Sequence, residues 1–435
     1  MTVNILNLPG WEVIAVAEGG HDYTVIAQFT PQPSACPRCG VTPPTLYRFG
    51  TRENTFHDLP SHGRRVGILV RRQRYKCRDC AAVFLEPLPD MDDRRVATRR
   101  LVEWIERESL RRTFVSVAEE TGVHEKTVRN IFTDYVARLD AEREIITPRW
   151  LGIDEIHLLR APRGVIANVE LRTLVDLLPD RTRDTITRYL MRLPEREAVE
   201  WVAMDMHRPY RDAARSVLPQ ARVVVDKFHV VRMASQALDE VRKEVRSGLT
   251  PAQRRQLMHD RFILLRRPDD LTDKQRLVLE VWTTRFPVLG EAYRAKEAFY
   301  DLWSAADQAS ARDAYEAWRG GLSRELRPFF KPLTTAVGNW SQEIFAHFDS
   351  SLTNAYTEAV NSVIKLTNRI GRGYSFDVIR AEMVHGLNRS DRRPALWVPT
   401  TARHVAETRP AYRARDGGTQ LSTLADRLQR GELEG

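Results

Sequence analysis

From Arg149 onward, short apolar runs and helical patterns alternate in an order that few folds can accommodate. Three runs of strand length come first, WLGIDEIHL, GVIANV and RTLVDLL. A helical stretch, DTITRYLMRL, then leads to the strand VEWVAMD, the helix YRDAARSVL and the strand ARVVVD. These segments predict an α/β domain built on one sheet. In such a sheet the first strand and the fourth lie side by side, so the residues at their ends meet.

This order is that of an RNase H-like sheet, and acidic residues occupy its strand ends. Asp154 lies in the first strand and Asp205 ends the fourth, while Glu358 follows much later in the helical pattern NAYTEAVNSVIK. Acidic groups at strand ends commonly hold hard divalent cations. Two Mg²⁺ (or Mn²⁺) ions held in this way can clamp the attacking and leaving oxygens of a phosphodiester. We therefore predict that Asp154, Asp205 and Glu358 are the catalytic residues and metal ligands of DNA or RNA strand chemistry.

A further aspartate competes with Asp205 as the second metal ligand. Asp226 ends the fifth strand, in VVVDKFHVV, and His229 follows one helical turn later. The strand count favours Asp205, because the fourth strand neighbours the first and the fifth does not. We interpret Asp226 and His229 as accessory residues and keep Asp226 as the alternative ligand.

The helix that carries Glu358 offers two more polar groups on the same face. Asn361 and Lys365 follow Glu358 at intervals of one and two helical turns. One face thus presents a carboxylate, an amide and a cation, and we predict accessory roles for the amide and the cation. A surface helix with polar residues at ordinary spacing is the alternative.

The four cysteines form two CxxC pairs near the start of the chain, CPRC (Cys36, Cys39) and CRDC (Cys77, Cys80). A two-residue spacer lets both sulfurs of a pair reach the same ion, so two pairs can supply four thiolates to one tetrahedral zinc. Strand-like runs between the pairs would form the hairpins of a zinc ribbon. Four thiolates leave no open position, which predicts a structural Zn²⁺; two disulfides or a redox pair are the alternative.

The segment from Arg64 to Arg78 is rich in arginine and contains no acidic residue. Strand periodicity places Arg72, Arg74 and Lys76 on one face, where they could follow a phosphate backbone. We predict that these three residues bind DNA. A solvated charged face would carry the same pattern.

A helix-turn-helix is indicated further on, in FVSVAEETGVHEKTVRNIFTDYVARL. A small residue falls at the crossing of two helices, Gly122 at the turn, and Val128 and Ile131 on the inner side of the second helix. The outer side of that helix would present four candidate DNA-binding residues to a major groove. They are Lys126, Thr127, Arg129 and Asn130. An ordinary helical hairpin has a similar pattern.

The expected division of the chain includes one large interruption of the catalytic core. Between Val230 and about Phe348 the pattern is helical and contains several tryptophans, and an unstructured loop of that size is uncommon inside a compact domain. We expect an all-helical insertion with the tryptophans in its core. The expected segments are a zinc-ribbon DNA-binding domain at 1–90, a helix-turn-helix domain at 94–147, the first part of the core at 148–232, the helical insertion at 233–347, the second part of the core at 348–390 and a tail at 391–435.

Charge and hydropathy agree with a DNA partner. Lys and Arg number 67 against 58 Asp and Glu, for a net charge of +9. A polyanion suits this balance, although many basic proteins bind none. The sequence contains no apolar stretch of membrane-spanning length and its N-terminus lacks the cationic start of a secretion signal, so we expect a cytoplasmic protein with no membrane partner.

These motifs together resemble the DDE transposases of bacterial insertion sequences, in particular the ISL-three (ISL3) group. The resemblance is carried by CPRC and CRDC, by GIDE at Asp154, by MDMHRPY at Asp205, by VVDKFHVV at Asp226 and by TEAVNSVIK at Glu358. It extends from the ribbon to about Asn388. It implies DNA-binding modules ahead of an RNase H-like core, and Mg²⁺-dependent cutting at terminal inverted repeats followed by joining of the 3′-OH to target DNA.

The expected partners are double-stranded DNA, at the terminal inverted repeats and at the target, and further copies of the chain in a homo-oligomer on that DNA. Two other functions compete. One is a DNA-binding transcriptional regulator whose RNase H-like domain is not catalytic, and the other is an RNase H-type nuclease that cuts without joining. The three carboxylates in compatible positions argue against the first, and the two sequence-reading modules argue against the second.

Overall fold

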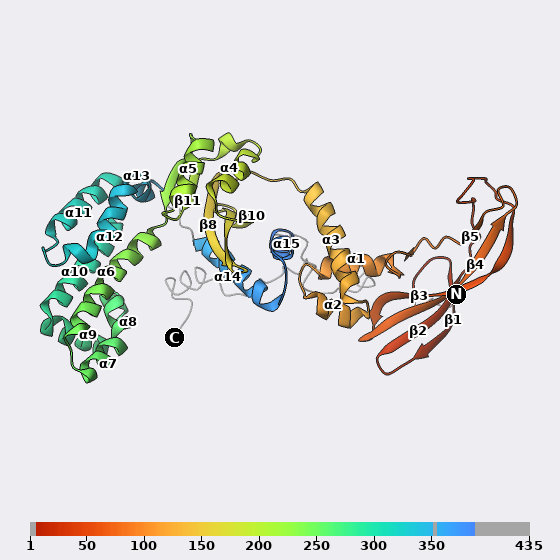
Figure 1. Ribbon diagram of the computed structural model, residues 1–435, viewed down its shortest axis with the longest axis horizontal. Helices are drawn as coiled ribbons and strands as arrows, with labels where there is room; N and C mark the ends of the chain where they lie inside the picture. Colours follow the sequence, from red (N-terminus) through yellow and green to blue (C-terminus); the bar gives the residue numbers. More distant parts are fainter. Residues whose placement is uncertain (1–5, 351–354, 388–435) are drawn as a thin grey trace, which may run out of the picture. The chain divides into compact units, whose positions relative to one another are not determined.

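The computed structural model describes residues 6–350 and 355–387 of the chain (Figure 1). The expected tail at 391–435 lies outside the described residues. The strands described before residue 99 form one sheet in the order β1-β2-β4-β3-β7-β6, and β5 pairs with β4. They are β1 (Trp11–Glu18), β2 (Asp22–Phe29), β3 (Leu46–Ser61), β4 (Arg64–Cys77), β5 (Val83–Leu85), β6 (Met91–Asp92) and β7 (Ala97–Thr98). Since β6 and β7 belong to this sheet, it continues past the expected boundary at residue 90.

The long hairpin of β3 and β4 connects the two cysteine pairs, as the strand-like runs predicted. Its tip is the two-residue turn His62-Gly63, in which both residues have positive φ (51° and 74°). This geometry suits a two-residue hairpin because its twist matches that of the strands. The register shifts between Arg48 and Thr51 of β3, which bends the far end of the hairpin.

This bend corrects one expectation. Arg72 follows Val66, Ile68 and Val70 on the face of β4 that is buried. Its guanidinium donates to both oxygens of Asp93, at 2.7 and 3.0 Å, and to the carbonyl of Glu86. The expectation that Arg72 lies on an exposed face with Arg74 and Lys76 is therefore wrong, because a bent strand does not keep one face outward along its whole length.

Three helices follow, α1 (Arg99–Glu108), α2 (Phe114–Thr121) and α3 (Glu125–Glu142). Thr113 caps α2 by accepting from the N–H of Ser116 at 3.2 Å, and α2 ends at Gly122, whose φ of 74° only glycine adopts easily. Val128 and Ile131 are buried, as predicted. Helices α2 and α3 thus form the expected helix-turn-helix.

The second sheet has the strand and helix order expected from the sequence. Its strands lie in the order β10-β9-β8-β11-β12, and β8 pairs with β11 in parallel, with Ile153 opposite Met204. The first and fourth strands are therefore neighbours. The elements are β8 (Trp150–Leu158), β9 (Ala161–Asn168), β10 (Thr173–Leu178), α4 (Arg183–Met191), β11 (Trp201–Met204), α5 (Arg208–Val217) and β12 (Arg222–Val225).

The two faces of this sheet bury different partners. Leu151 and Ile153 pack with the buried residues of α4 and α5, among them Tyr210. The opposite face, which carries Ile156, packs with the buried residues of α14 (Ala355–Ile370) and α15 (Phe376–Ala381), which are followed by a π-helical turn (Glu382–Leu387). Because strand residues alternate between faces, Asp154 belongs to the α14 side.

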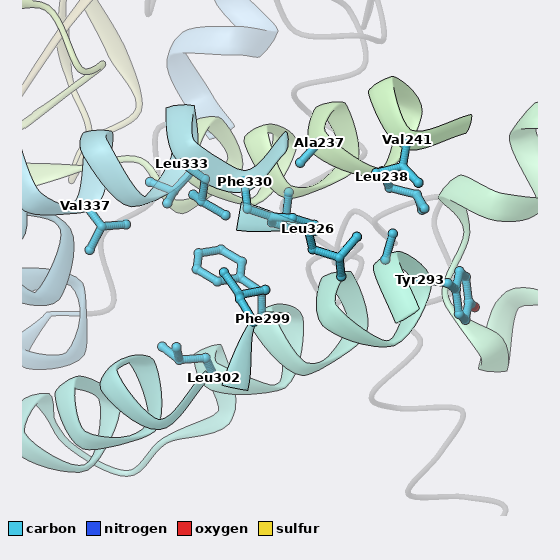
Figure 2. Close-up of a cluster of buried hydrophobic side chains, with 14 of the residues drawn as sticks. Ala237, Leu238, Val241, Tyr293, Phe299, Leu302, Leu326, Phe330, Leu333 and Val337 are labelled. Carbon is cyan, nitrogen blue, oxygen red and sulfur yellow. The ribbon is translucent and has the colours of Figure 1, made fainter. Parts of the chain in front are cut away.

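Residues 227–345 form helices joined by short turns, as the helical pattern of the sequence predicted. The helices are α6 (Lys227–Ser247), α7 (Pro251–His259), α8 (Arg261–Leu265), α9 (Asp273–Arg285), α10 (Pro287–Asp301), α11 (Gln308–Gly321), α12 (Arg327–Asn339) and α13 (Ser341–Phe345). Figure 2 shows side chains of α6, α10 and α12, such as Leu238, Phe299 and Phe330, facing one another. The expected boundary at 232/233 falls inside α6, so one continuous helix leads from the sheet into the helical segment.

The tryptophans of this segment lie in or against its core. Trp282 and Trp340 are buried, and Trp303 and Trp318 pack against the same cluster. Trp282 also donates to Asp260 at 2.9 Å. Their packing confirms the expectation of a core role.

Helix α14 lies directly on β8 at a glycine. A Cβ atom at Gly152 would stand 3.0 Å from Val169 Cγ2 and 3.1 Å from Oγ1 of Thr357, which is buried. The absence of a side chain at position 152 thus allows the closest approach of α14 to the strand that carries Asp154.

Replacing Gly152 by valine should destabilise the fold by about 1–3 kcal/mol, because the added methyl groups push α14 away from β8. Gly67→Val is the matched control, since a Cβ at this other strand glycine would meet nothing closer than 3.6 Å. Chemical denaturation compares the two variants. Equal free energies of unfolding would contradict the direct packing of α14 on β8.

Candidate functional site

Two aspartates lie side by side on neighbouring parallel strands. Asp205 directly follows the last residue of β11, as expected, whereas Asp154 lies in the middle of β8 (Trp150–Leu158) and not at its end, because β8 continues beyond it in its pairing with β9. Asp154 follows Ile153 in β8 and Asp205 follows Met204 of β11, and Ile153 pairs with Met204. Asp154 is buried and Asp205 is half-buried. The main chain alone therefore brings together the first two predicted metal ligands.

Helix α14 adds an amide to this pair. The Nδ2 of Asn361 donates to Oδ2 of Asp154 at 2.8 Å, across 207 positions of the sequence. The Oδ1 of Asn361 is buried and meets no donor among the described residues. Glu358 stands one turn earlier on this helix and Lys365 one turn later, and both are exposed.

Asp226 and His229 lie beside the first two acids. The backbone N–H of Asp226 donates to the carbonyl of Met204 at 3.2 Å, which places Asp226 next to Asp205 at the sheet edge. Its Oδ1 accepts from the N–H of Phe228 at 2.9 Å and caps α6. One turn into α6, Nδ1 of His229 lies 3.0 Å from Oδ1 of Asp205.

The proximity of these charges changes their proton affinities. Burial, and after it the charge of Asp205, raises the pKa of Asp154 to about 7. The contact with Asp205 raises the pKa of His229, with smaller contributions from Asp226 and Asp154. Both shifts mean that a positive charge stabilises this cluster of carboxylates. A divalent cation would supply that charge, and the buried amide oxygen of Asn361 would add a further oxygen of the kind such ions prefer.

The three predicted metal ligands do not converge as tightly as the cysteines do. Over residues 6–350 and 355–387, the four cysteines are the group whose ligand atoms all lie within 4.8 Å of one another. Within these ranges Asp154, Asp205 and Glu358 form no comparable group, and Glu358 is exposed in the first turn of α14.

The cysteine cluster has the spacing of a zinc site. The Sγ atoms of Cys36 and Cys80 lie 3.8 Å apart and those of Cys39 and Cys77 lie 3.9 Å apart, without disulfides. Thiolates about 2.3 Å from a tetrahedral zinc are separated by about 3.8 Å. The backbone N–H of Cys39 contributes most to lowering the pKa of Cys36 to about 7, whereas burial and the neighbouring thiols raise the pKa of Cys39 and of Cys77. The cluster supports a structural Zn²⁺.

The predicted DNA-contacting residues of α3 differ in their availability. Lys126 and Asn130 are exposed, and Thr127 is half-buried. Arg129 donates to Glu125 at 2.9 Å and its guanidinium lies 4.9 Å from the ring centre of Phe114. The guanidinium of Arg129 therefore already makes contacts within the helix-turn-helix, which leaves fewer of its donors for DNA.

Comparison with known protein families identifies this arrangement. A family model described as "Transposase", that of the ISL3 group of DDE transposases, matches residues 151–383. The chain belongs to the ISL3 family of transposases. Two further models of the same family match the N-terminal modules: a "Helix-turn-helix domain of transposase family ISL3" at residues 86–136 and a "zinc-finger of transposase IS204/IS1001/IS1096/IS1165" at residues 32–80.

Individual transposases are similar over much of their length. The transposase for insertion sequence element IS1001 of Bordetella parapertussis is 26% identical over 389 residues, which is 85% of this chain and 93% of the relative. The transposase for IS1557 of Mycobacterium tuberculosis strain H37Rv is 26% identical over 274 residues, covering 57% of this chain and 61% of the relative. In this transposase, no helix of the described part is long and apolar enough to cross a membrane.

Sequence reasoning missed several residues around the acids. Arg181 pairs with Glu155, and the hydroxyl of Tyr210 donates to the carbonyl of Asp154 at 3.5 Å. Thr357 forms the contact of α14 with Gly152. The strand ends gave no signal for Arg181, whereas Tyr210 belongs to the MDMHRPY motif.

Zinc should be present at about one ion per chain, ligated by all four cysteines. Cys77→Ser should lose the metal and unfold the ribbon, because a small hairpin buries too little apolar surface to fold alone. Elemental analysis of purified transposase, with thermal unfolding before and after chelation, measures both effects. A zinc-free chain with full stability under reducing conditions would contradict the site.

The raised pKa of Asp154 predicts a pH-dependent penalty in the metal-free protein. Its carboxyl ionises near pH 7 in the fold and near its ordinary 3.8 when unfolded, so wild type loses stability as pH rises from about 4 to about 7. Asp154→Asn escapes this loss. Relative to wild type, the variant should be more stable at pH 8 than at pH 5 by on the order of 1–3 kcal/mol.

Denaturation in a chelator at the two pH values makes this comparison. Asp184→Asn, which removes an exposed carboxylate from α4, controls for the loss of one charge. A stability difference between wild type and Asp154→Asn that does not change with pH would show that the fold does not perturb Asp154.

Proposed function

We propose that this transposase binds the terminal inverted repeats of an insertion sequence and carries out divalent-metal-dependent strand cleavage and strand transfer. The observation that carries the proposal is the acidic pair formed by Asp154 of β8 and by Asp205, which directly follows β11, with Asn361 of α14 bound to Asp154. A helix-turn-helix and a zinc-binding module precede this site in the same chain. Recognition of a DNA end and chemistry on it are thus combined in one polypeptide.

The architecture supports an RNase H-like assignment of the core. The sheet order β10-β9-β8-β11-β12, with β8 and β11 parallel, corresponds to an RNase H-like sheet of five strands. In this assignment the helical segment is an insertion between β12 and α14. The core then consists of two parts that are far apart in sequence and packed together through Gly152 and Thr357.

Asp154, Asp205 and Glu358 would hold Mg²⁺ or Mn²⁺, whose chemistry when bound is to stabilise the attacking and leaving oxygens of a phosphodiester. Asp154 and Asp205 present adjacent oxygens from a rigid sheet edge. Glu358 belongs to the first turn of α14, and the bond from Asn361 to Asp154 fixes that helix relative to the sheet. Asn361 is therefore proposed to position α14, in addition to the amide oxygen that it could offer to the ion.

Asp226 and His229 are proposed to position the metal ligands without binding the metal themselves. Asp226 is buried and caps α6, so one of its oxygens is already used by the backbone. His229 faces Asp205 and orients its carboxylate, as partners of metal ligands commonly do. This division favours Asp205 over Asp226 as the second ligand. Lys365 is exposed on α14, and its proposed accessory role is to contact a DNA phosphate.

For DNA binding, the exposed residues of α3 are proposed to read base edges and the ribbon is proposed to contact phosphates. Lys126, Thr127 and Asn130 carry the first role, with a smaller share for Arg129 because it packs on Phe114. Arg74 and Lys76 carry the second, without Arg72. A homo-oligomer on the DNA would hold the two ends of the element together.

A nuclease that cuts without joining would use the same carboxylates. A regulator without catalysis would need neither the acidic pair nor its amide partner. Joining of a 3′-OH to target DNA is therefore the reaction that separates the proposed function from both.

Asp154→Asn, Asp205→Asn and Glu358→Gln should each abolish cleavage and joining while leaving end binding nearly intact, because an amide keeps the shape and loses the anionic charge that holds the metal. His229→Ala and Asp226→Asn should lower activity by about 10–100-fold. The assay uses DNA that carries the inverted repeats flanking the gene, with Mg²⁺ or Mn²⁺, beside binding measurements on the same variants.

Two outcomes would contradict this assignment. Full activity of Asp205→Asn beside an inactive, folded Asp226→Asn would move the second ligand to Asp226. Wild-type cleavage without any joined product would favour the nuclease.

A further inference from the structure

The outer part of the ribbon hairpin presents aromatic rings to solvent. Tyr47 and Phe49 of β3 are 36% and 45% exposed, and their ring centres lie 6.3 Å apart. Tyr47 pairs with Lys76 of β4, and Lys76 pairs with Val83 of β5, which is 40% exposed. Because directly paired residues of a sheet point to the same side, these side chains belong to one face of the three strands β3, β4 and β5.

The opposite face of the same strands is the one that packs. Tyr75 is buried with its ring centre 6.1 Å from that of Phe84, and Cys77 is buried in the cysteine cluster. A hairpin end of this size needs only one face for its core. The rings of Tyr47 and Phe49 are thus not required by the packing on the cysteine side, and large exposed rings that adjoin one another commonly mark a binding surface.

The cations of this region surround the two rings. The guanidinium of Arg74 lies 5.5 Å from the ring centre of Phe49, and Nζ of Lys76 lies 5.9 Å from both rings. The guanidinium of Arg78 lies 5.9 Å from the ring of Tyr47. We call these three cations and two rings the aromatic-cationic face.

We propose that the aromatic-cationic face binds single-stranded DNA, with unpaired bases stacked on Tyr47 and Phe49 and the phosphates held by Arg74, Lys76 and Arg78. Aromatic rings set in a positively charged surface are the combination that holds single strands, because every base offers a π face and every linkage an anion. The inference rests on the proposed action on DNA ends and adds a strand preference to the ribbon.

The rings decide between single-stranded and double-stranded DNA. In a duplex the faces of the bases are covered by their neighbours, so a duplex would contact the cations of the aromatic-cationic face but could not stack on its rings. An unpaired strand can contact the cations and also stack its bases on the rings. Strand cleavage and transfer at the ends of an element create such unpaired nucleotides, which gives the face a substrate within the proposed reaction.

The test measures binding of a fluorescent oligothymidine and of a random duplex of equal length by the full-length, zinc-loaded chain. The Tyr47→Ala, Phe49→Ala double variant should lose at least about tenfold in affinity for the oligothymidine, because two stacking contacts are removed. Its affinity for the duplex should change by less than about threefold. Tyr47→Phe should bind like wild type, since the ring is kept.

Phe262→Ala is the matched control, because Phe262 is also exposed, at 67%, and also lies near an arginine, in the helical segment. Zinc content shows whether the ribbon of each variant is folded, and thermal unfolding checks the helical segment of Phe262→Ala. Equal losses for duplex and oligothymidine, no loss on removal of both rings, or no oligothymidine binding by wild type would each overturn the proposal. So would self-association of wild type that the double variant loses, since the face would then bind a second copy. Cleavage at the element ends is assayed separately, so a failure here leaves the proposed function standing.

Discussion

The parallel, in-register pairing of β8 with β11 is the interaction on which the acidic site depends. It places Asp154 of β8 next to Asp205, which directly follows β11, and the pairing of β11 with β12 adds Asp226. Burial of Asp154, and after it the negative charge of Asp205, makes ionisation of Asp154 unfavourable and raises its pKa to about 7. The fold tolerates this unfavourable burial of an acidic group because backbone hydrogen bonds between the strands hold the aspartates in place.

Helix α14 completes the site from a distant part of the sequence. Its approach depends on the missing side chain at Gly152 and on the bond from Asn361 to Asp154. Between these two parts of the core, α6 starts at the site, where it carries His229, and continues into the helical core through Leu238 and Val241. The same helix thus belongs to the site at one end and to the helical segment at the other.

The N-terminal module uses one hairpin for two purposes. Near the turn, β3 and β4 bury an apolar core, and Arg72 is held there by Asp93. Beyond the register shift, the buried face carries Tyr75 and Cys77 and the other face turns its rings and cations outward. This small sheet buries side chains on one of its faces only. If a metal stabilises that buried face, the opposite face is available to bind a ligand.

The sequence by itself determined the order of elements, the two cysteine pairs and the turn at Gly122, because each of these follows from local patterning, ligand spacing or backbone conformation. It also identified β8 and β11 as neighbours, since connection rules restrict how the strands can be arranged. Only the tertiary structure decided that Arg72 is buried, that Asp226 caps a helix and that Asn361 binds Asp154. These features depend on strand bending and on packing between segments as much as 207 positions apart. The periodicity of residues along the sequence gives no information about either.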